Sequence, residues 1–553
     1  MTMQPSEQQR DTREKRQGEH RQTQQGEQTA WSSQLTALQN AYLEQFEQLA
    51  GDPEGRLAAQ EYLCASDARY HGEVIGMGFL PKLYDRAALS AFDTLVTRTY
   101  AILEKMTERF IEDAEYRALF RFSPLLEKLI ALPNKTACTI PICRIDLFLN
   151  EDDGSFKFCE FNTDGTSAMN EDAEVANALA VSATLKRFGT HHRLCAQELF
   201  DPWVETFLDL YYQSADSVPE PVVAIVDYAK SAVLPEQLEF RRRFERYGIN
   251  CLVVDVASLE YLPGALYGRD VSEQHPAHNM PLRIDAVYRR AVTSELVQEL
   301  ENTGADVDSL LDPGQRIEIC PRGAAALVAG VARGKVCMMG GFQTQVAHSK
   351  ASFCLLHHPR TLEFLSEDER HFVREHVPFT TWLDESCIDI SLVKSEREKW
   401  IIKPADGYAS KGVQAGKSLS AAAWSALIDE KLEEEYIVQE YVPQFQTLNT
   451  LPVPLDDEGT PLFSSVEMAQ RSAEYEPDSA YGLRPYNVLT GLFGYGGRFI
   501  GVYVRSGPDA IIVGARGGIT LASLLVDFEP SAAQTVCPRP LWKDPDVPAF
   551  FRQ

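Results

Sequence analysis

Residues 141 to 162 constrain the fold of this chain more than any other segment does. They read PICRIDLFLNEDDGSFKFCEFN, a pattern that predicts two short strands joined by a polar turn. Arg144 and Asp146 lie two residues apart, as do Glu160 and Asn162, so each pair shares one face of its strand. A hairpin therefore gathers a guanidinium, two carboxylates and a carboxamide on one surface. The alternative is an ordinary antiparallel hairpin whose solvent-facing side is polar.

Three of these side chains offer oxygen ligands. Asp146, Glu160 and Asn162 form the kind of oxygen set that Mg²⁺ prefers when it also holds phosphates. Arg144 beside them is suited to stabilise charge on a phosphoryl group during transfer. The segment thus predicts a magnesium and phosphate site, with Arg144 as its catalytic residue.

Composition narrows the class of protein. The chain has 553 residues, a net charge of −27 and a pI near 4.9, which disfavours a general nucleic-acid-binding role. An acidic surface serves solubility in many proteins and could also attract a cationic substrate. The eleven cysteines form no CxxC motif, so we expect free thiols in a reducing compartment. Without a secretory h-region or an apolar run of about 18 residues, we expect a cytoplasmic protein with no membrane span.

Hydrophobic periodicity divides the chain into regions. Residues 1–30 hold eight glutamines and ten charges and are predicted to be disordered. Amphipathic helices over 31–135, including 86–106 and 115–132, are expected to pack a core of their own. The later regions are the metal-binding hairpin with its helical continuation (136–205), a Rossmann-like region (206–335), nucleotide-binding lobes (336–530) and a C-terminal tail (531–553).

The Rossmann-like region is predicted from a strand–helix–strand pattern. The segments VVAIVD, EQLEFRRRFERYG and CLVVDV are typical of a βαβ unit in an open parallel sheet. A third strand, IDAVYRR, ends with Arg289 and Arg290, at the edge where parallel sheets collect ligands. We therefore expect these arginines to bind substrate; the alternative is that they end the strand at the surface.

A glycine-containing loop in WIIKPADGYASKGV is the second strong signal. Lys403 ends an apolar strand, and Gly407, Ser410, Lys411 and Gly412 form a loop whose amides and charges suit phosphate oxygens. Such a loop is also a natural lid over a nucleotide. It is not a Walker A loop, and K-P-x-x-G also occurs in ordinary surface turns.

Two further basic residues are predicted to contact ATP. Lys350 lies in AHSKASFCLLHHP, which predicts the beginning of a helix. Arg505 lies in PYNVLTGLFGYGGRFIGVYVRSG, which predicts an antiparallel pair interrupted by glycines. Either side chain could add positive charge near the phosphates.

The segment YIVQEYVP predicts a strand that ends in an extended stretch. Its residues Gln439, Glu440, Tyr441 and Val442 could present backbone groups to an adenine edge. Glu440 could also hold ribose hydroxyls. The alternative is an ordinary edge strand.

Taken in order, the motifs R-x-D, E-x-N-x-D, S-K-A, K-P-x-x-G and Q-E-Y-V resemble those of the glutathionylspermidine synthetase family, over about residues 135 to 520. The resemblance implies an α/β (α+β) architecture: an ATP-grasp fold in circularly permuted order, with a Rossmann-like pre-ATP-grasp βαβ domain and a helical N-terminal region. It also implies an ATP-dependent carboxylate–amine ligase that forms an amide through an acyl phosphate, with ATP as co-substrate and two Mg²⁺ ions. Carried over by position, the magnesium ligands are Asp146, Glu160 and Asn162, the transition-state arginine is Arg144, the ATP-binding lysines are Lys350 and Lys403, and the adenine hinge is Gln439 to Val442.

The chain departs from this family after the E-x-N-x-D motif. The family continues with a proline and small hydroxyl residues that contact glutathione. Here the residues run from Thr163 through Gly165 to Ser167, without the proline and one residue shorter. We expect Thr163, Asp164, Thr166 and Ser167 to bind substrate. The expected partners are a small carboxylate or peptide and an amine, with no nucleic acid and no membrane. The alternatives are a peptide or natural-product ligase on the same scaffold and a non-catalytic nucleotide-binding protein.

Overall fold

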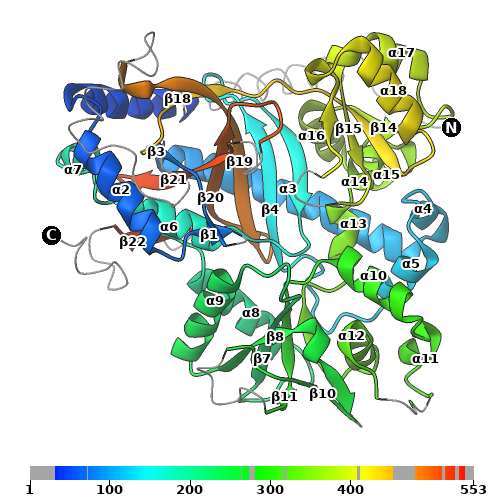
Figure 1. Cartoon of the computed structure of the whole chain (residues 1–553). Helices are drawn as coiled ribbons and strands as arrows, with labels where there is room; N and C mark the ends of the chain where they lie inside the picture. Colours follow the sequence, from blue (N-terminus) through cyan, green and yellow to red (C-terminus); the bar gives the residue numbers. More distant parts are fainter. Residues whose placement is uncertain are drawn as a thin grey trace, which may run out of the picture.

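Three of the five sheets in the described part of the chain set its architecture. The computed structural model describes residues 31–70, 72–262, 264–272, 280–315, 317, 320–407, 411–452, 480–512, 517–529 and 535–541. Within these residues a mixed sheet of nine strands lies at the centre, a four-stranded parallel sheet lies below it, and a four-stranded antiparallel sheet lies at the upper right of Figure 1.

The central sheet contains the predicted hairpin. Its strand order is β22-β6-β21-β20-β19-β4-β5, with β18 paired to β19 and β3 paired in parallel to β21. The strands are β3 (Met77–Tyr84), β4 (Ile142–Leu149), β5 (Phe156–Asn162), β6 (Leu194–Glu198), β18 (Gln446–Asn449), β19 (Arg484–Tyr495), β20 (Arg498–Gly507), β21 (Ile519–Val526) and β22 (Cys537–Pro540). The β19–β20 hairpin turns on Gly496 and Gly497, whose φ angles of 54° and 79° suit a two-residue turn. Both antiparallel pairs predicted from the sequence are therefore confirmed, and they lie side by side through the β4–β19 pairing.

The amino-terminal helices do not pack a separate core, which corrects that expectation. Residues 31–48 and α3 (Arg86–Glu112) are helical as predicted, but their apolar side chains lie against the central sheet. Phe92 of α3 makes edge-on contacts with Trp31 and with Phe499 of β20, at ring distances of 5.7 and 6.0 Å. The physical reason is that a wide sheet must bury both faces, and α3, which crosses behind the strands in Figure 1, covers one of them.

The remaining elements before and after the hairpin are all shorter than α3. The single helix predicted over 115–132 is divided, because Arg121 adopts a φ of 56° and Pro124 begins a new helix. The elements are α2 (Pro53–Ala65), β1 (Arg69–Tyr70), β2 (Glu73–Val74), α4 (Ala114–Ala118), α5 (Pro124–Ile130), α6 (Met169–Leu179) and α7 (Ala183–Phe188).

The parallel sheet confirms the predicted βαβ unit. The strands β7 (Val222–Asp227) and β8 (Asn250–Asp255) are parallel neighbours, joined through α9 (Leu234–Arg246). The order is β13-β12-β7-β8, so β12 (Ala286–Arg289) also joins as predicted, and β13 (Cys337–Met339) extends the sheet beyond residue 335. The elements around it are α8 (Asp201–Tyr212), β9 (Glu260–Leu262), β10 (Ala265–Gly268), β11 (Leu282–Ile284), α10 (Thr293–Thr303), α11 (Val307–Leu311) and α12 (Gly323–Ala332).

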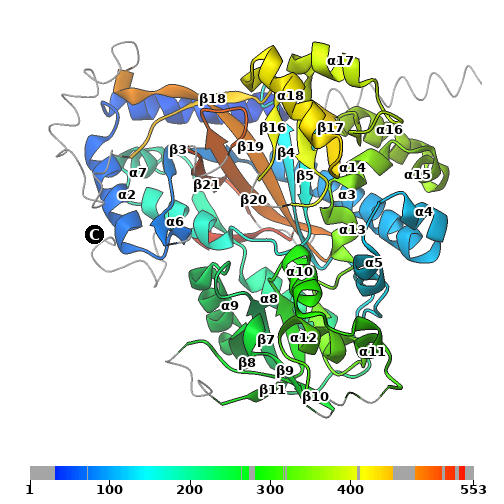
Figure 2. The ribbon, with the colours of Figure 1, turned by 45° about the vertical axis from the view of Figure 1, so that its right-hand side comes forward.

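The small antiparallel sheet forms a lobe of its own. Its order is β14-β17-β15-β16, and the buried side chains of Trp424, Ile402 and Val438 contribute to its core. The strands and flanking helices are β14 (Thr380–Trp382), α17 (Ile390–Ser395), β15 (Trp400–Pro404), β16 (Gln414–Ala415), α18 (Ala421–Lys431) and β17 (Tyr436–Glu440). In Figure 2 this lobe stands over the β4–β5 edge of the central sheet.

Four short helices join the parallel sheet to this lobe. They are α13 (Thr344–His348), α14 (Ala351–Leu356), α15 (Pro359–Phe364) and α16 (Glu367–His376). The helix predicted from AHSKASFCLLHHP is thus two helices, with Lys350 at the break between them.

The carboxyl-terminal segment is only partly a tail. Residues 537–540 form β22, which pairs with β6 and so covers an edge of the central sheet that would otherwise expose unpaired backbone groups. Residues 1–30 and 542–553 lie outside the described residues. All eleven cysteines are free thiols, as predicted. Among the described residues, no helix is both long and apolar enough to cross a membrane.

Candidate active site

The β4–β5 hairpin brings the predicted site residues together. Arg144 lies opposite Asn162 and Asp146 lies opposite Glu160 in the strand register. The surface is not a solvated outer face, because Asp146 is 1% exposed and Arg144 is 7% exposed. The small lobe and α13 cover the hairpin at this end.

Two arginines hold Asp146 between them. Arg144 donates from Nε to Asp146 Oδ1 at 2.7 Å and from Nη2 to Oδ2 at 3.0 Å. Arg505 donates from Nη2 to Asp146 Oδ2 at 3.0 Å and lies 4.0 Å from Glu160 Oε1. Burial alone would lower the pKa of Arg144, but Asp146 beside it raises that pKa overall. Both guanidinium groups therefore stay charged at the centre of the site.

Gly491 makes this meeting of arginines possible. It lies opposite Asp146 on β19, between the strands that carry Arg144 and Arg505. A Cβ atom there would stand 2.8 Å from both Arg144 Cδ and Asp146 Oδ1. The glycine therefore leaves the space through which Arg505 reaches across β19. In the sequence, Gly491 is marked only by its position in β19, where alternate residues point to the same face of the sheet.

Replacing Gly491 by alanine should displace Arg144 and Asp146 and lower any ATP turnover by roughly 10- to 100-fold, because small misplacements of catalytic groups are costly. Phosphate release from Mg·ATP measures the effect. Gly494→Ala is the matched control, because its Cβ would instead press on Cys143 and on Val96 of α3, on the other side of the sheet. Equal losses in both variants would show a general effect on the sheet rather than on the site.

Two lysines reach the hairpin from other parts of the chain. Lys403, at the end of β15, donates to the backbone oxygen of Cys159 on β5 at 3.2 Å. Lys350 donates to the backbone oxygen of Gly407 at 2.8 Å. The two lysines are 6% and 8% exposed, so the junction between the lobe and the central sheet encloses both.

The charges around Glu160 keep it ionised. Burial on its own would raise the pKa of Glu160, but Lys350, Arg505 and Lys403 together lower it to about 2. The pKa of Lys350 is lowered, chiefly by burial, with Glu160 acting against that change. The junction is therefore a site of strong positive potential with an anionic carboxylate inside it, which suits phosphate binding.

The predicted magnesium ligands fit the ion by their chemistry. Asp146 and Glu160 supply carboxylates and Asn162 supplies an amide oxygen. Glu160 is partly accessible, with 31% of its side chain exposed, and so is Asn162, which donates to Glu160 Oε1 at 3.4 Å. Both oxygens of Asp146 already accept hydrogen bonds from the two arginines, so a bound metal would have to share these oxygens with them. Among the described residues, no group of three or more His, Cys, Asp or Glu side chains is arranged to hold a metal, so Asn162 would be needed as the third ligand.

The loop after Asn162 is held by its own side chains. Thr163 donates from Oγ1 to the backbone oxygen of Thr344 at 2.7 Å, and Thr166 donates from Oγ1 to the backbone oxygen of Asn162 at 2.7 Å. The Ser167 backbone oxygen accepts from Arg144 Nη1 at 2.8 Å. The hydroxyls of Thr163 and Thr166 are thus engaged within the protein, while Ser167 is half-buried.

The two arginines at the end of β12 lie behind this loop. Arg289 forms a buried ion pair with Asp164, whose Oδ2 also accepts from the Thr293 N–H at 2.7 Å. Arg290 pairs with Glu236 of α9 at 2.8 Å. The side chains of Arg289 and Arg290 are 0% and 3% exposed, so they do not end the strand at the surface. They tie the loop to the parallel sheet.

The predicted adenine hinge runs along the edge of the small lobe. Gln439 turns inward and donates from Nε2 to Thr380 Oγ1 at 2.9 Å, whereas Glu440 is exposed. The N–H of Tyr441 donates to the backbone oxygen of Lys399 at 2.7 Å, and Val442 is half-buried beyond it.

The glycine loop follows β15 and lies near Tyr436, at the start of β17, and so at the opposite end of that strand from the hinge. Gly407 and Gly412 have φ angles of 155° and 74°, a region that favours glycine, and Lys411 is exposed. Ser410 lies outside the described residues.

Tyr503 and Glu171 extend the site, although no motif points to them. The Arg144 guanidinium lies 5.2 Å from the centre of the Tyr503 ring, and Tyr503 donates from its hydroxyl to Glu171 Oε2 at 2.5 Å. The one available sequence signal is that Tyr503 lies two residues before Arg505, on the same face of β20.

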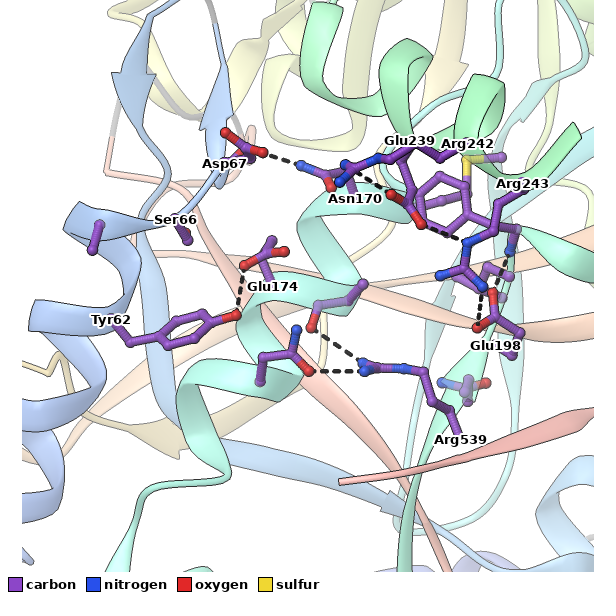
Figure 3. A pocket seen from close by; sticks show the side chains of 17 residues that line it. Tyr62, Ser66, Asp67, Asn170, Glu174, Glu198, Glu239, Arg242, Arg243 and Arg539 are labelled. Atoms are coloured by element: carbon purple, nitrogen blue, oxygen red, sulfur yellow. Dashed lines mark hydrogen bonds and ion pairs between the residues drawn. The ribbon is translucent and has the colours of Figure 1, made fainter. Parts of the chain in front are cut away.

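A cavity of about 230 Å³ lies on another side of α6, shown in Figure 3. None of the predicted site residues lines it. Glu174 of α6 accepts from the Tyr62 hydroxyl at 2.9 Å, and Arg243 of α9 donates to Glu198 at 3.2 Å. α6 therefore separates this cavity from the charged cluster.

Comparison with known proteins supports the fold. A scan against protein-family models finds no match, and a search of curated protein sequences finds none. A glutathione synthetase-like effector from Globodera pallida aligns over 85% of this chain and 96% of that chain, with 12% identity and a TM-score of 0.50. A putative gamma-glutamylcysteine synthetase from Methylobacillus flagellatus KT aligns over 81% and 90%, with 9% identity and a TM-score of 0.35. A RimK domain ATP-grasp protein from Sphaerobacter thermophilus aligns over 55% and 90%, with 14% identity and a TM-score of 0.22.

The first similarity shows that this chain shares its overall fold with the effector, whereas the other two are too weak to add to it. The mixed α/β fold expected from the sequence is thereby confirmed.

Proposed function

We propose that this chain, on its glutathione synthetase-like fold, is an ATP-dependent carboxylate–amine ligase. The observation that carries the proposal is a convergence of four cations on two carboxylates where the small lobe meets the central sheet. The residues are Arg144, Arg505, Lys350 and Lys403 around Asp146 and Glu160. Without a highly charged ligand, the close approach of these four cations, of which Arg144, Lys350 and Lys403 are buried, would have a considerable cost in free energy.

Each of these groups has a role in phosphoryl transfer. Lys350 and Lys403 hold the ATP phosphates, while Arg144 and Arg505 neutralise charge on the transferring group. Their fixed positions supply electrostatic stabilisation without reorganisation during the reaction. When bound by Asp146, Glu160 and Asn162, magnesium would add positive charge at the phosphates.

The reaction then proceeds in two steps. The substrate carboxylate takes the γ-phosphoryl group to give an acyl phosphate, and an amine displaces phosphate to leave an amide. Water must be excluded, because it would hydrolyse the acyl phosphate. We assign this role to the loop between Gly407 and Gly412.

The arrangement of the substrate loop refines the proposal. Because Asp164 and Arg289 pair within the protein, we assign them to positioning the loop rather than to substrate contact. The same holds for Arg290 and Glu236. Ser167, beside Arg144, is then the loop residue best placed to meet the substrate carboxylate or peptide.

The β4–β5 hairpin precedes the lobe that carries Lys403 in the chain, and this order supports the proposal of a circularly permuted fold like that of glutathionylspermidine synthetase-like proteins. We propose that class for the enzyme. The alternative is a peptide or natural-product ligase that uses the same two-step reaction. The identity of the carboxylate and the amine distinguishes the two classes.

Millimolar Mg·ATP should raise the melting temperature, since a ligand at about 100 times its dissociation constant adds roughly 2.7 kcal/mol to the free energy of unfolding. Lys403→Ala should lose the shift. Lys399→Ala should keep it, because that neighbouring side chain is 65% exposed and pairs with Glu396. No shift in the unsubstituted protein would remove the basis of the nucleotide proposal. A phosphate-release screen with ATP, Mg²⁺ and a matrix of carboxylates and amines then identifies the substrates.

A further inference from the structure

The charged groups on the face of the central sheet that carries Arg144 and Asp146 follow a fixed order across the strands. Lys403 of the small lobe contacts β5 at one side, and Glu171 of α6 hydrogen-bonds with β20 and β21 at the other. Between them, in strand order, lie Glu160 on β5, Asp146 and Arg144 on β4, Gly491 on β19, and Arg505 and Tyr503 on β20. The lysines at the β5 side of the sheet suit the phosphates of the nucleotide. The β20–β21 side is therefore left for the amine, which attacks in the second step.

Glu171 is the carboxylate on that opposite side. Its Oε2 accepts from the Tyr503 hydroxyl at 2.5 Å and from Thr520 Oγ1 at 3.5 Å. Its Oε1 takes no hydrogen bond from any residue that the structure describes, and the side chain is half-buried. The titratable and charged groups that face it are Tyr503 and Arg505 on β20, Arg144 on β4 and Glu236 on α9.

The other carboxylates of the charged cluster, Asp146 and Glu160, are already engaged. Asp146 accepts from two arginines, and Glu160 lies among Lys350, Lys403 and Arg505. Neither lysine is among the main charges that act on Glu171. Burial raises the pKa of Glu171, with the Tyr503 hydrogen bond acting against that change, so it is a better proton acceptor than an ordinary exposed carboxylate.

We propose that Glu171 binds the ammonium group of the amine substrate and takes its proton before attack. This inference rests on the proposed ligase function. The ammonium gives one proton to the Glu171 carboxylate, and the freed lone pair forms the C–N bond with the acyl carbon. The C–O bond to phosphate breaks with its electron pair, and the second proton on nitrogen leaves with the phosphate. The products are an amide, hydrogen phosphate and protonated Glu171, which returns its proton to solvent.

Glu174 provides a matched control on the same helix. It lies about one turn after Glu171 and also accepts from a tyrosine hydroxyl, that of Tyr62 at 2.9 Å. It faces the cavity in Figure 3 and not the charged cluster. Glu174→Gln and Glu171→Gln therefore make the same chemical change on two sides of α6.

The test uses two nucleophiles with a carboxylate that is active in the phosphate-release screen. Hydroxylamine is largely neutral at pH 7 and traps an acyl phosphate as a hydroxamate without needing a base, whereas a primary alkylamine is protonated. Glu171→Gln should lower kcat/KM for the alkylamine by about 10²- to 10⁴-fold, the usual contribution of a general base, and leave hydroxamate formation near the unsubstituted rate. The deficit should shrink as the pH approaches the amine's own pKa, about 10. Glu171→Asp should recover part of the alkylamine rate, and Glu174→Gln should change neither reaction.

Equal loss of both reactions in Glu171→Gln, with an unchanged melting temperature, would assign Glu171 to the architecture of the site and overturn the proposal. An unchanged alkylamine rate would overturn it as well. If the unsubstituted protein forms no hydroxamate with any carboxylate, the ligase function itself fails, and this inference fails with it. That outcome is distinct from a loss confined to the alkylamine.

Discussion

Replacement of Arg144 by lysine should lower ATP turnover by about 10³- to 10⁵-fold, the range for arginines that stabilise phosphoryl transfer. Arg144 binds both oxygens of Asp146 through a planar fork and reaches the Ser167 backbone oxygen with its remaining nitrogen. Lysine cannot reproduce three contacts in fixed directions with one ammonium group. Phosphate release under saturating Mg·ATP and the best substrate pair gives the rate.

The matched control for this change is Arg498→Lys, because Arg498 begins β20 of the same sheet and is exposed. We expect its turnover to stay close to that of the unsubstituted protein. A lysine variant of Arg144 that keeps near-normal turnover would mean that the guanidinium only supports the hairpin, and the transition-state role would have to be given up.

Glu160→Gln should lower turnover by about 10²- to 10³-fold and keep the fold, because it removes one charge-stabilising group from the reaction. Its side chain is 31% exposed, and glutamine can keep the contact with Asn162. Asp146→Asn is a different experiment. That carboxylate is 1% exposed beside the buried Arg144, so its loss leaves Arg144 without its carboxylate partner and should destabilise the fold by about 3–5 kcal/mol.

Urea unfolding measures the free energy of unfolding, which should fall most in Asp146→Asn. Phosphate release then measures the turnover of both variants. Since the pKa of Glu160 is about 2, below its ordinary value of 4.5, its share of the stability is complete above about pH 4.5 and is lost as the pH falls toward 2. Glu160→Gln should therefore lessen the loss of stability in that acid range. Normal turnover in Glu160→Gln would reduce the hairpin to a structural element.

Local patterns were sufficient to predict the elements that carry the site. The two-residue alternation placed Arg144 with Asp146 and Glu160 with Asn162 on one face, and the register confirms both pairs. The βαβ pattern likewise predicted the parallel pairing of β7 and β8. These predictions succeed because side-chain direction in a strand follows from the backbone, which repeats every two residues.

Contacts between distant segments could not be predicted in the same way. Arg505 meets Asp146 only because Gly491 leaves room on the strand between them. The burial of Arg289 and Arg290 in ion pairs was not predictable either, since their partners Asp164 and Glu236 lie far away in sequence. The helices of residues 31–112 were expected to form their own core, yet they cover the central sheet.

The sequence by itself determined which residues of this protein share a strand face, where strands and helices alternate, and which side chains have the chemistry for phosphate and magnesium. Only the tertiary structure decided which of those side chains meet. It set Lys350 and Lys403 beside the hairpin, enclosed Arg289, and brought Glu171 to the far side of the cluster through Tyr503. The physical reason is that periodicity follows from backbone geometry within a few residues, whereas ion pairs and burial depend on how whole sheets and helices pack.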